Sequence, residues 1–434
     1  MSHNSASNDV RLRRSITWLQ GAALTTGSIL GSGILVLPAT AAVLAGPASL
    51  VSWVSMGLFA FPMALTLAAL ASRYPEAGGI AAYARRAFGP AAGTIAGWLF
   101  VGTVPVGGPV AALIGANYAG VLLSLSPLQV NLLAFFMLVL TLFFNYRGIE
   151  LSGSVQVVVV SVIAVLLAAS VFAAAAHVQA GAFTPFAPYG WRPVGVALTF
   201  LFWAFIGCEM TLHLAEEFKN PQRDIRISLV LSLVVIDVLY LAVAFVTIGT
   251  GAYQGPSGAA ALARMVGESW GRWAEVVTAV LGFAVCYGTV HTYVAGFSRL
   301  VYAQARQGDF PAFFARLHPR FQTPYGAMLV LGPVFGLAIS LNYLLGLNLN
   351  VLMQLPSATF ILLYIVAMAA AFRLLPAGMG RWLAGFSLVA CAFVYLLTGC
   401  AGLYPLAIGV AGWLVGSRRM MRGRKLMRQK EGVV

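Results

Sequence analysis

Long apolar segments follow one another along almost the entire chain, and they constrain its fold more than any other feature. A helix needs about 20 apolar residues to cross the hydrocarbon core of a bilayer. Only 9% of the 434 residues are charged and 60% are hydrophobic, whereas soluble proteins carry about 25% charged residues. The sequence therefore predicts an all-α integral membrane protein. We expect twelve transmembrane segments, at residues 18–45, 48–71, 91–122, 128–145, 152–176, 193–217, 227–250, 273–303, 326–345, 350–372, 382–398 and 400–417.

The Lys and Arg residues fall almost entirely on one side of this predicted topology. Twelve segments put both termini on the same side, and that side carries 23 of the 26 Lys and Arg residues. The opposite side keeps only Arg192, Arg264 and Arg272. Cytoplasmic loops of membrane proteins carry such an excess, so topology accounts for the net charge of +14 without a nucleic acid partner. We expect a multi-pass protein of the cell inner membrane with both termini in the cytoplasm.

The apolar segments leave no room for a soluble domain. We expect a cytoplasmic N-terminal tail at 1–17, one transmembrane domain at 18–417 and a basic cytoplasmic tail at 418–434. The basic tail suits contact with anionic lipid headgroups, and a topology signal without lipid recognition explains it equally well. All four cysteines lie within predicted membrane segments and no CxxC spacing occurs. The sequence therefore predicts no disulfide, no metal site and no cofactor.

Two of the predicted segments contain residues that interrupt a helix. GSILGSGILVLP at 27–38 combines glycines, serines and a proline, and FWAFIGCEMTLHLAEEF at 202–218 contains a glycine and a glutamate. Each interruption opens a five-segment half, 18–176 and 192–372, with two further helices at 382–417. An odd number of segments inverts the second half relative to the first, and paired interruptions of this kind indicate the midplane site of a transporter. Ordinary helix-packing glycines are the alternative explanation.

A helix interrupted inside the membrane exposes backbone groups that lipid cannot satisfy. A zwitterionic amino acid satisfies both kinds, since its carboxylate suits the N–H groups of the new N-terminus and its ammonium suits the free carbonyls. Gly31, Ser32 and Gly33 are the candidate carboxylate cradle. The carbonyls of Ile29 and of residues 204–206 are the candidate ammonium partners, and Gly207 at the second break is a further candidate for substrate binding.

The intramembrane acids are candidates for proton coupling, because a charge at this depth is costly. Glu209 follows the break at Gly207 and is one turn before His213. It is either a proton acceptor or a permanently hydrogen-bonded group that holds the unwound backbone. Asp237 is the second candidate, with contact to water or to a neighbouring helix as the alternative role.

Aromatic residues stand near the predicted breaks. Trp203, Phe205 and Tyr293 are candidates to surround a substrate side chain, although such aromatics also serve as core packing. No further Arg, Lys or acidic residue accompanies them. The sequence therefore disfavours arginine, polyamines and dicarboxylates and favours a small neutral substrate.

Four separated motifs resemble one family of transporters. They are GSGILVLP, RYPEAGGIAAYARRAFG, FWAFIGCEMTLHLAEEFKNPQRDI and FSRLVYAQARQGDFPAFFARLHPRFQTP. In this order they resemble the amino acid–polyamine–organocation transporters. VPVGGPVAA at 104–112 and HLAEEFKNPQRD at 213–224 are most similar to the bacterial exporters of L-methionine and branched-chain amino acids.

The resemblance implies a fold and a set of binding residues. It implies the five-plus-five inverted repeat shared with sodium-coupled neurotransmitter transporters, with broken helices 1 and 6 and alternating access. It implies that Ser32 and Gly33 bind the substrate carboxylate. It further implies that Ile29, Trp203 and Ile206 lie near the ammonium, that Tyr293 gates or lines the site, and that Glu209 is the family's glutamate of helix 6.

Two departures from the family pattern bear on coupling. Some proton-coupled relatives carry a lysine in the fifth segment, and residues 152–170 contain none. Asp237 has no counterpart in the family pattern, so its role is open.

The leading hypothesis is a secondary transporter that exports neutral apolar amino acids (methionine, leucine, isoleucine or valine) by proton antiport. An importer or exchanger of small neutral amino acids with the same fold is the alternative. An intramembrane enzyme is disfavoured, because neither HExxH nor GxSxG occurs. A channel is the fourth hypothesis.

Overall fold

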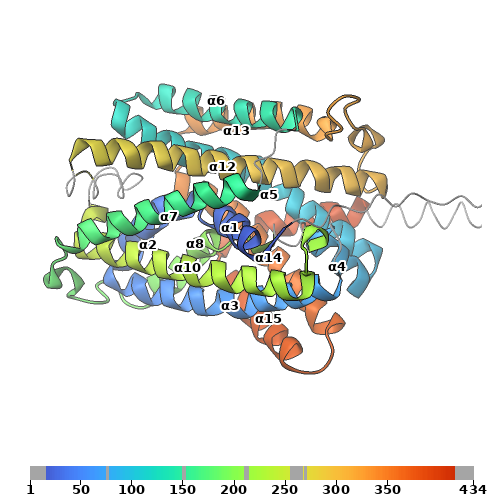
Figure 1. Ribbon diagram of the computed structural model, residues 1–434, viewed down its shortest axis with the longest axis horizontal. Coiled ribbons are helices and arrows are strands. Elements are labelled where there is room, and N and C mark those ends of the chain that lie inside the picture. The colour runs from blue at the N-terminus through green and yellow to red at the C-terminus, as the bar shows by residue number, and fades with distance from the viewer. Residues whose placement is uncertain are drawn as a thin grey trace, which may run out of the picture.

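The computed structural model is an all-helical bundle, and the structure describes residues 16–74, 78–148, 153–209, 215–254, 267 and 271–415. Most helices run along the long axis of the molecule, with α1 and α8 at the centre (Figure 1). The α-helices are α1 Trp18–Ile29, α2 Gly33–Ala45, α3 Ser49–Arg73, α4 Gly79–Phe88, α5 Pro90–Leu123, α6 Pro127–Tyr146, α7 Gly153–Ala175, α8 Arg192–Ala204, α10 Pro221–Gly249, α12 Arg272–Arg306, α13 Tyr325–Leu345, α14 Leu349–Leu374 and α15 Met379–Leu396.

Eight continuous helical segments of the described chain are long and apolar enough to cross a membrane. One of them runs from Gly33 to Arg73 and joins α2 to α3 through a short 3-10 turn. Three shorter apolar helices cover Val160–Ala175, Arg192–Ala204 and Gly399–Val415. The helices therefore coincide with the apolar segments expected from the sequence, but fewer than twelve qualify as uninterrupted spans. The shortfall arises partly because the first and sixth segments are broken.

Capping residues determine where several helices begin. Thr17 and Ser126 precede α1 and α6, and each forms a capping box with a glutamine three residues later, Gln20 and Gln129. Pro221 begins α10, where the missing N–H of proline costs nothing. The amphipathic stretch after α3 forms α4, which crosses one end of the bundle (Figure 1).

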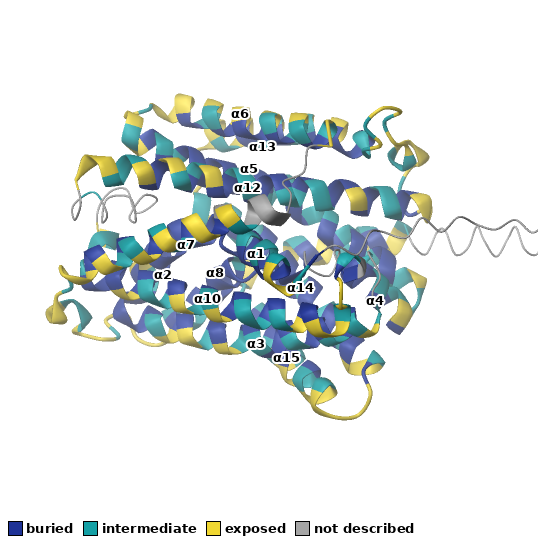
Figure 2. Cartoon of the chain, viewed as in Figure 1, coloured by how far each residue is buried: buried dark blue, intermediate teal, exposed yellow. Residues whose placement is uncertain are grey.

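Burial separates the helices at the centre from those at the periphery. Dark blue covers the central helices, whereas α6, α7 and α13 carry exposed outer faces (Figure 2). These outer faces present large apolar side chains, such as Phe136, Phe172 and Leu337. An apolar periphery of this extent is suited to lipid contact and not to water.

Two packed layers surround the broken helices. α10 packs against both α1 and α3, and α2 packs against α8. On the other side, α5 contacts α12 and α14. Among the described residues the only β pairing is a bridge between Ile16 and Phe218, which ties the entry of α1 to the chain after the sixth segment. The breaks are thereby held at the centre of the bundle.

Candidate functional site

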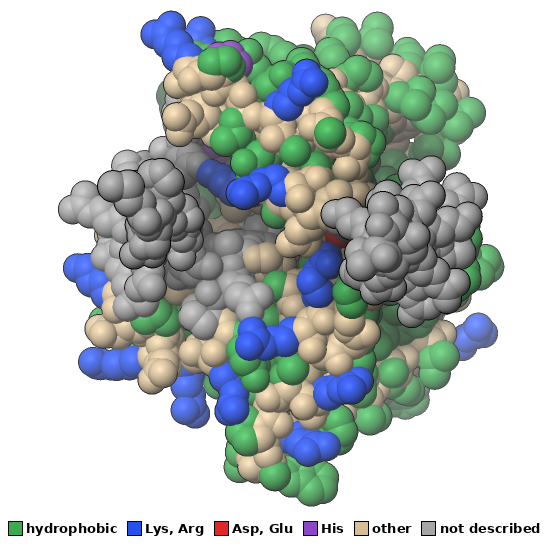
Figure 3. All heavy atoms as spheres, turned by 90° about the vertical axis from the view of Figure 1, so that its right-hand side faces the viewer, with side chains coloured by type: hydrophobic (Ala, Val, Ile, Leu, Met, Phe, Trp, Pro, Cys, Tyr) green, Lys and Arg blue, Asp and Glu red, His purple; other side chains and the backbone are tan. Residues whose placement is uncertain are grey.

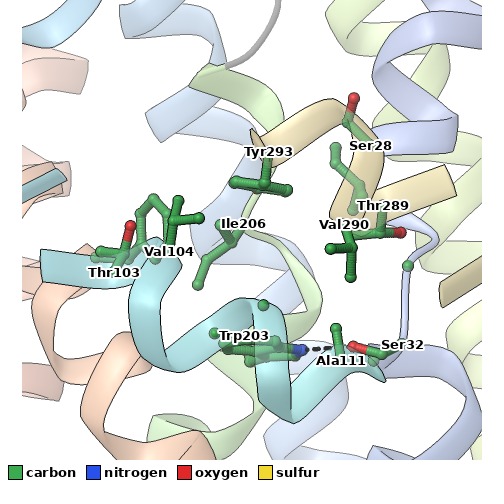
Figure 4. A pocket seen from close by; sticks show the side chains of 16 residues that line it. Ser28, Ser32, Thr103, Val104, Ala111, Trp203, Ile206, Thr289, Val290 and Tyr293 are labelled. Carbon is green, nitrogen blue, oxygen red and sulfur yellow. Dashed lines mark hydrogen bonds between the residues drawn. The ribbon is translucent and has the colours of Figure 1, made fainter. Parts of the chain in front are cut away.

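A small cavity lies where the break between α1 and α2 faces α5, α8, α12 and α14 (Figure 4). The volume within it that the centre of a water molecule can occupy is about 50 Å³. Its lining residues are Ser28, Ile29, Gly31, Ser32, Gly33, Thr103, Val104, Gly107, Gly108, Ala111, Trp203, Ile206, Thr289, Val290, Tyr293 and Phe360.

The first break leaves a helix N-terminus at this cavity. α1 ends at Ile29 and α2 begins at Gly33, so three residues separate the two helices. The first N–H groups of a helix have no partner within the helix. Ser32 is the N-cap of α2, but its side chain makes no capping hydrogen bond. Its hydroxyl oxygen instead accepts a hydrogen bond from Nε1 of Trp203, at 3.2 Å.

The second break follows α8 and contacts the first one. α8 ends at Ala204, and Gly207 has a φ of +133°, a conformation that favours glycine. A Cβ atom on Gly207 would lie 2.8 Å from the carbonyl carbon of Ser28. Gly33 is similarly close to the second break, since its Cβ would lie 3.1 Å from Cα of Ala204. The glycines therefore allow the two interrupted backbones to touch.

Glu209 is buried directly behind the second break, with 1% of its surface exposed. Its Oε2 accepts hydrogen bonds from the N–H of Gly207 at 2.9 Å and from the hydroxyl of Tyr364 at 2.7 Å. Its Oε1 accepts one from the hydroxyl of Tyr293 at 3.0 Å. Hydrogen bonds to a carboxylate are stronger than bonds between neutral groups. Glu209 therefore connects the unwound backbone to α12 and α14.

Tyr240 of α10 binds both interrupted helices at their C-terminal ends. Its hydroxyl lies 3.0 Å from the carbonyl oxygen of Ile29 and 3.0 Å from that of Ala204. Both carbonyls were candidate ammonium partners, and they share the single hydroxyl hydrogen of this phenol. Each carbonyl oxygen has a second lone pair, so a further donor at these positions would share the acceptor with Tyr240.

The cavity is apolar and contains no Asp, Glu, Lys or Arg among its lining residues. The hydroxyls of Ser28, Thr103 and Thr289 donate to carbonyls of their own helices. The remaining wall is formed mainly by aliphatic and aromatic side chains, among them Val104 and Phe360. This surface suits an uncharged, apolar group.

The cavity brings together most of the residues predicted to bind substrate. Seven of them line it: Ile29, Gly31, Ser32, Gly33, Trp203, Ile206 and Tyr293. Phe205 and Gly207 do not. Phe205 is buried against the ring of Tyr240, with ring centroids 5.6 Å apart, and Gly207 contacts the end of α1.

Several lining residues were missed by the sequence interpretation. Thr103, Val104 and the glycines of α5 border the cavity, as do Thr289 and Val290 of α12. The stretch VPVGGPVAA carried a signal for α5, because glycines allow close helix approach. A Cβ on Gly107 would lie 3.3 Å from the indole ring of Trp203. On α12, Gly288 stands next to Thr289, but the helix is not interrupted there.

Asp237 lies away from the cavity, in the contact between α10 and α3. A Cβ on Gly57 would lie 2.9 Å from its Oδ1, and Oδ1 is buried without a hydrogen-bond partner within the described structure. The other polar candidate near Glu209, His213, lies outside the described residues.

Comparison with known proteins identifies the family. The family model described as amino acid permease matches residues 16–400. The chain belongs to the amino acid permease family. This places the permease in the amino acid–polyamine–organocation superfamily, as the four motifs predicted, and makes it a multi-pass membrane transporter and not an enzyme.

Curated relatives match the permease over most of its length. The amino acid permease YecA of Bacillus subtilis is 41% identical over 403 residues, which cover 93% of this chain and 95% of the relative. The L-methionine/branched-chain amino acid exporter YjeH of Escherichia coli is 32% identical over 94% of this chain and 97% of the relative. The branched-chain amino acid permease BcaP of Bacillus subtilis is 30% identical over 78% and 77%.

Proposed function

We propose that the permease exports neutral apolar amino acids, namely methionine, leucine, isoleucine and valine, by alternating access and proton antiport. The observation that carries this proposal is the apolar cavity without a charged lining residue at the N-terminus of α2. The name of the exporter YjeH supports both the direction and the substrate class. Import or exchange of small neutral amino acids is the alternative, since the name of the permease BcaP states no direction of transport.

The proposed substrate position follows from the backbone groups at the two breaks. The carboxylate lies at the N-terminus of α2, where Gly31, Ser32 and Gly33 offer N–H groups and a favourable helix dipole. The ammonium lies toward the carbonyls of Ile29 and of residues 204–206, near Trp203. Phe205 and Gly207 act from behind the lining by keeping these backbones in place.

The proposed substrate side chain occupies the apolar part of the cavity. Val104, Ile206 and Phe360 lie on its wall, and Tyr293 borders it from α12. Burial of an aliphatic side chain against such a wall is favourable by about 25 cal/mol per Å² of apolar surface. An additional charge on the substrate would find no counter-ion among the lining residues.

The coupling ion in this proposal is a proton, with Glu209 as its principal acceptor and Asp237 as a second candidate. Glu209 is buried and shares Tyr293 with the cavity wall. A proton on Glu209 competes with the three donors that its oxygens accept from. Protonation therefore weakens the links between the second break, α12 and α14, which is a direct way to favour a different conformation.

The proposed topology keeps twelve membrane segments, the five-plus-five inverted repeat and cytoplasmic termini in the inner membrane. We name the basic face as the end of the bundle that carries α4 and the C-terminal ends of α3, α12 and α14. Lys and Arg side chains gather over this face, and few acidic ones are visible (Figure 3). Positive residues favour the cytoplasmic side, and anionic headgroups are the expected partner of the basic segment 418–434, which lies outside the described residues.

The deciding experiment is efflux from proteoliposomes preloaded with labelled methionine or leucine, with and without an imposed pH gradient. Saturable efflux that accelerates when protons flow inward is the expected result. Saturable flux that ignores the gradient would favour an exchanger, and absence of flux with every neutral amino acid would reject the substrate class. Continuous conductance without saturation would indicate a channel.

A further inference from the structure

We propose that Glu209 exchanges its proton with the basic face through a narrow water passage between α4 and α12, separate from the path of the amino acid. This inference rests on the proposed proton antiport and extends it by assigning the route of the proton. The Glu209 carboxylate has a different environment on each side.

One side of Glu209 adjoins the substrate cavity. Its Oε1 accepts from the hydroxyl of Tyr293, and Tyr293 lines that cavity. Tyr364, the other phenol bound to the carboxylate, is buried on α14. A change in the substrate cavity therefore has a direct hydrogen-bonded connection to Glu209.

The other side of Glu209 borders a second, smaller void. The void leaves about 10 Å³ of room for water centres, close to the minimum that admits one water molecule. It is too small for an amino acid. Its lining comes from α4, α5, α12 and α14 and consists of Gly78, Ile80, Ala81, Ala96, Phe100, Leu300 and Leu363 besides Glu209.

This void adjoins a larger cavity of the basic face. Gly78, Ala81 and Leu300 line both. The outer cavity leaves about 200 Å³ of room for water centres, enough for several molecules. Arg85 and Arg86 of α4 stand on its wall. The two cavities therefore form a series that leads from Glu209 to the basic face.

Gln304 supplies a polar group inside this series. It lines the outer cavity, is only 4% exposed, and its Oε1 has no hydrogen-bond partner within the described structure. A buried amide oxygen without a partner is costly unless water satisfies it. The side-chain amide of Gln304 packs on Gly97 of α5. A Cβ atom at position 97 would overlap this amide. The glycine thus makes room for a polar side chain between two apolar helices.

The groups that face Glu209 suit a proton route. Tyr293 and Tyr364 contact it from α12 and α14, and Cys208 precedes it in the chain. The residues that α4 and α5 contribute to the inner void carry no titratable group. Farther out, Arg85 is neutralised by Asp309 at 2.9 Å. Among the described residues, water next to Gln304 is therefore the carrier that this series offers between Glu209 and the basic face.

The first test measures access and does not depend on transport. Ala96→Cys and Ala84→Cys form a matched pair, since both alanines are fully buried but only Ala96 lines the void. The exposed Cys400 is replaced by Ser in both. Silver ions, which are close to water in size, are applied from the basic face, and peptide mass spectrometry follows each thiol. We expect Ala96→Cys to react about tenfold faster or more, because only its thiol adjoins water. Equal rates would reject the passage.

The second test separates proton flux from amino acid flux. Gln304→Leu removes the polar group, and we expect proton-coupled efflux to fall about tenfold while exchange at equal pH stays within about twofold. Ala81→Leu narrows the constriction and should act in the same direction, whereas Ala91→Leu, outside both cavities, should not. Unchanged coupling, or an equal loss of both fluxes, would overturn the proposal. If the unaltered protein moves no neutral amino acid, the proposed function fails, and the silver test still decides the passage.

Discussion

The two helix breaks occupy equivalent places in the proposed repeats, but they satisfy their backbone groups in different ways. At the first break the side chain of Ser32 leaves its own helix uncapped and accepts from Trp203. At the second break the N–H of Gly207 donates to Glu209, two residues further along the same segment. The first break therefore leaves donors for a ligand, whereas the second supplies its own acceptor.

This difference indicates a division of labour between the halves. A helix N-terminus with free N–H groups attracts an anion, so the first break is equipped to hold the substrate carboxylate. The second break holds a buried acid, Glu209, which is the proton acceptor in the proposed antiport. Tyr240 connects the two, because its hydroxyl contacts a carbonyl oxygen of each. In the proposed mechanism, binding at one break and protonation at the other are thus linked through Tyr240.

The most severe test of this division is Ser32→Leu. The leucine side chain would fill the cavity at the N-terminus of α2, and a packed interior does not readily yield to added volume. We expect efflux to fall about 100-fold or more, with membrane insertion unchanged. Ser170→Leu is the control, since this serine bonds to its own helix away from the cavity. Normal efflux in Ser32→Leu would remove the first break from the site.

A second test compares the glycines of the two breaks. In Gly207→Ala the new Cβ would meet backbone atoms of Ser28 and the φ is unfavourable. In Gly31→Ala it would meet the side-chain oxygen of Thr289, at 2.7 Å. We expect transport to fall at least about tenfold in both variants. Thr289→Ala should rescue only Gly31→Ala, because the obstruction at position 31 is a side chain, whereas that at position 207 includes backbone.

The role of Gly207 would need revision if Gly207→Ala transported normally. Rescue is measured as the rate of exchange at equal pH in the single and double variants. Thermal unfolding in detergent provides the control for folding. If Thr289→Ala restored both variants equally, the contrast between backbone and side-chain obstruction would be wrong.

Tyr240→Phe separates the two breaks without changing the shape of the core. The phenylalanine keeps the ring contact with Phe205 but leaves two carbonyl oxygens without their donor. We expect a loss of about 1–3 kcal/mol in stability, the cost of unsatisfied buried polar groups. Efflux should fall less than in Ser32→Leu. Melting temperature and efflux of the same preparation check both, and an unchanged melting temperature would argue against the link.

Glu209→Gln tests the response of the second break to protons. The amide keeps the shape of the side chain but does not take up a proton in this pH range. We expect efflux to lose its dependence on pH while exchange at equal pH falls about threefold to tenfold, since one acceptor becomes a donor. The measurement is efflux over a series of pH values. A normal pH profile would assign Glu209 a structural role only.

The smallest effect is expected for Asp237→Asn. Asp237 lies in the contact between α10 and α3, does not line the cavity, and its Oδ1 has no partner in the described chain. An amide of the same shape leaves this contact intact, so counterflow should change less than about twofold. Loss of counterflow would instead bring Asp237 into the coupling mechanism and weaken the contrast between the two breaks.

Much of the fold followed from local sequence. The apolar segments, the basic side and the break between Ile29 and Gly33 are visible in composition, because helix interruption requires glycine, serine or proline at that point. The number of uninterrupted spans was less predictable, since a broken segment counts as apolar in the sequence but as shorter helices in the structure.

The candidate site was predicted mainly from residues on the breaks, with the addition of Tyr293 of α12, whereas Ser28 beside the first break was missed. Ser32 and Trp203 were expected because they adjoin interrupted backbone. Thr289 and Phe360 were not expected, because α12 and α14 continue without interruption past Gly288 and Pro356. Which face of a regular helix borders a cavity depends on its rotation within the bundle, and apolar segments buried on all sides carry little periodic signal.

The sequence alone determined that this protein spans a membrane, where its backbone is interrupted and that no surplus charge accompanies the breaks. Those properties depend on residue type and on neighbours along the chain. The tertiary structure alone decided that Tyr293 and Tyr364 hold Glu209, that Tyr240 joins both breaks and that a small void borders Glu209. Those contacts join residues far apart in the chain, and only the packing of helices brings such residues within hydrogen-bonding distance.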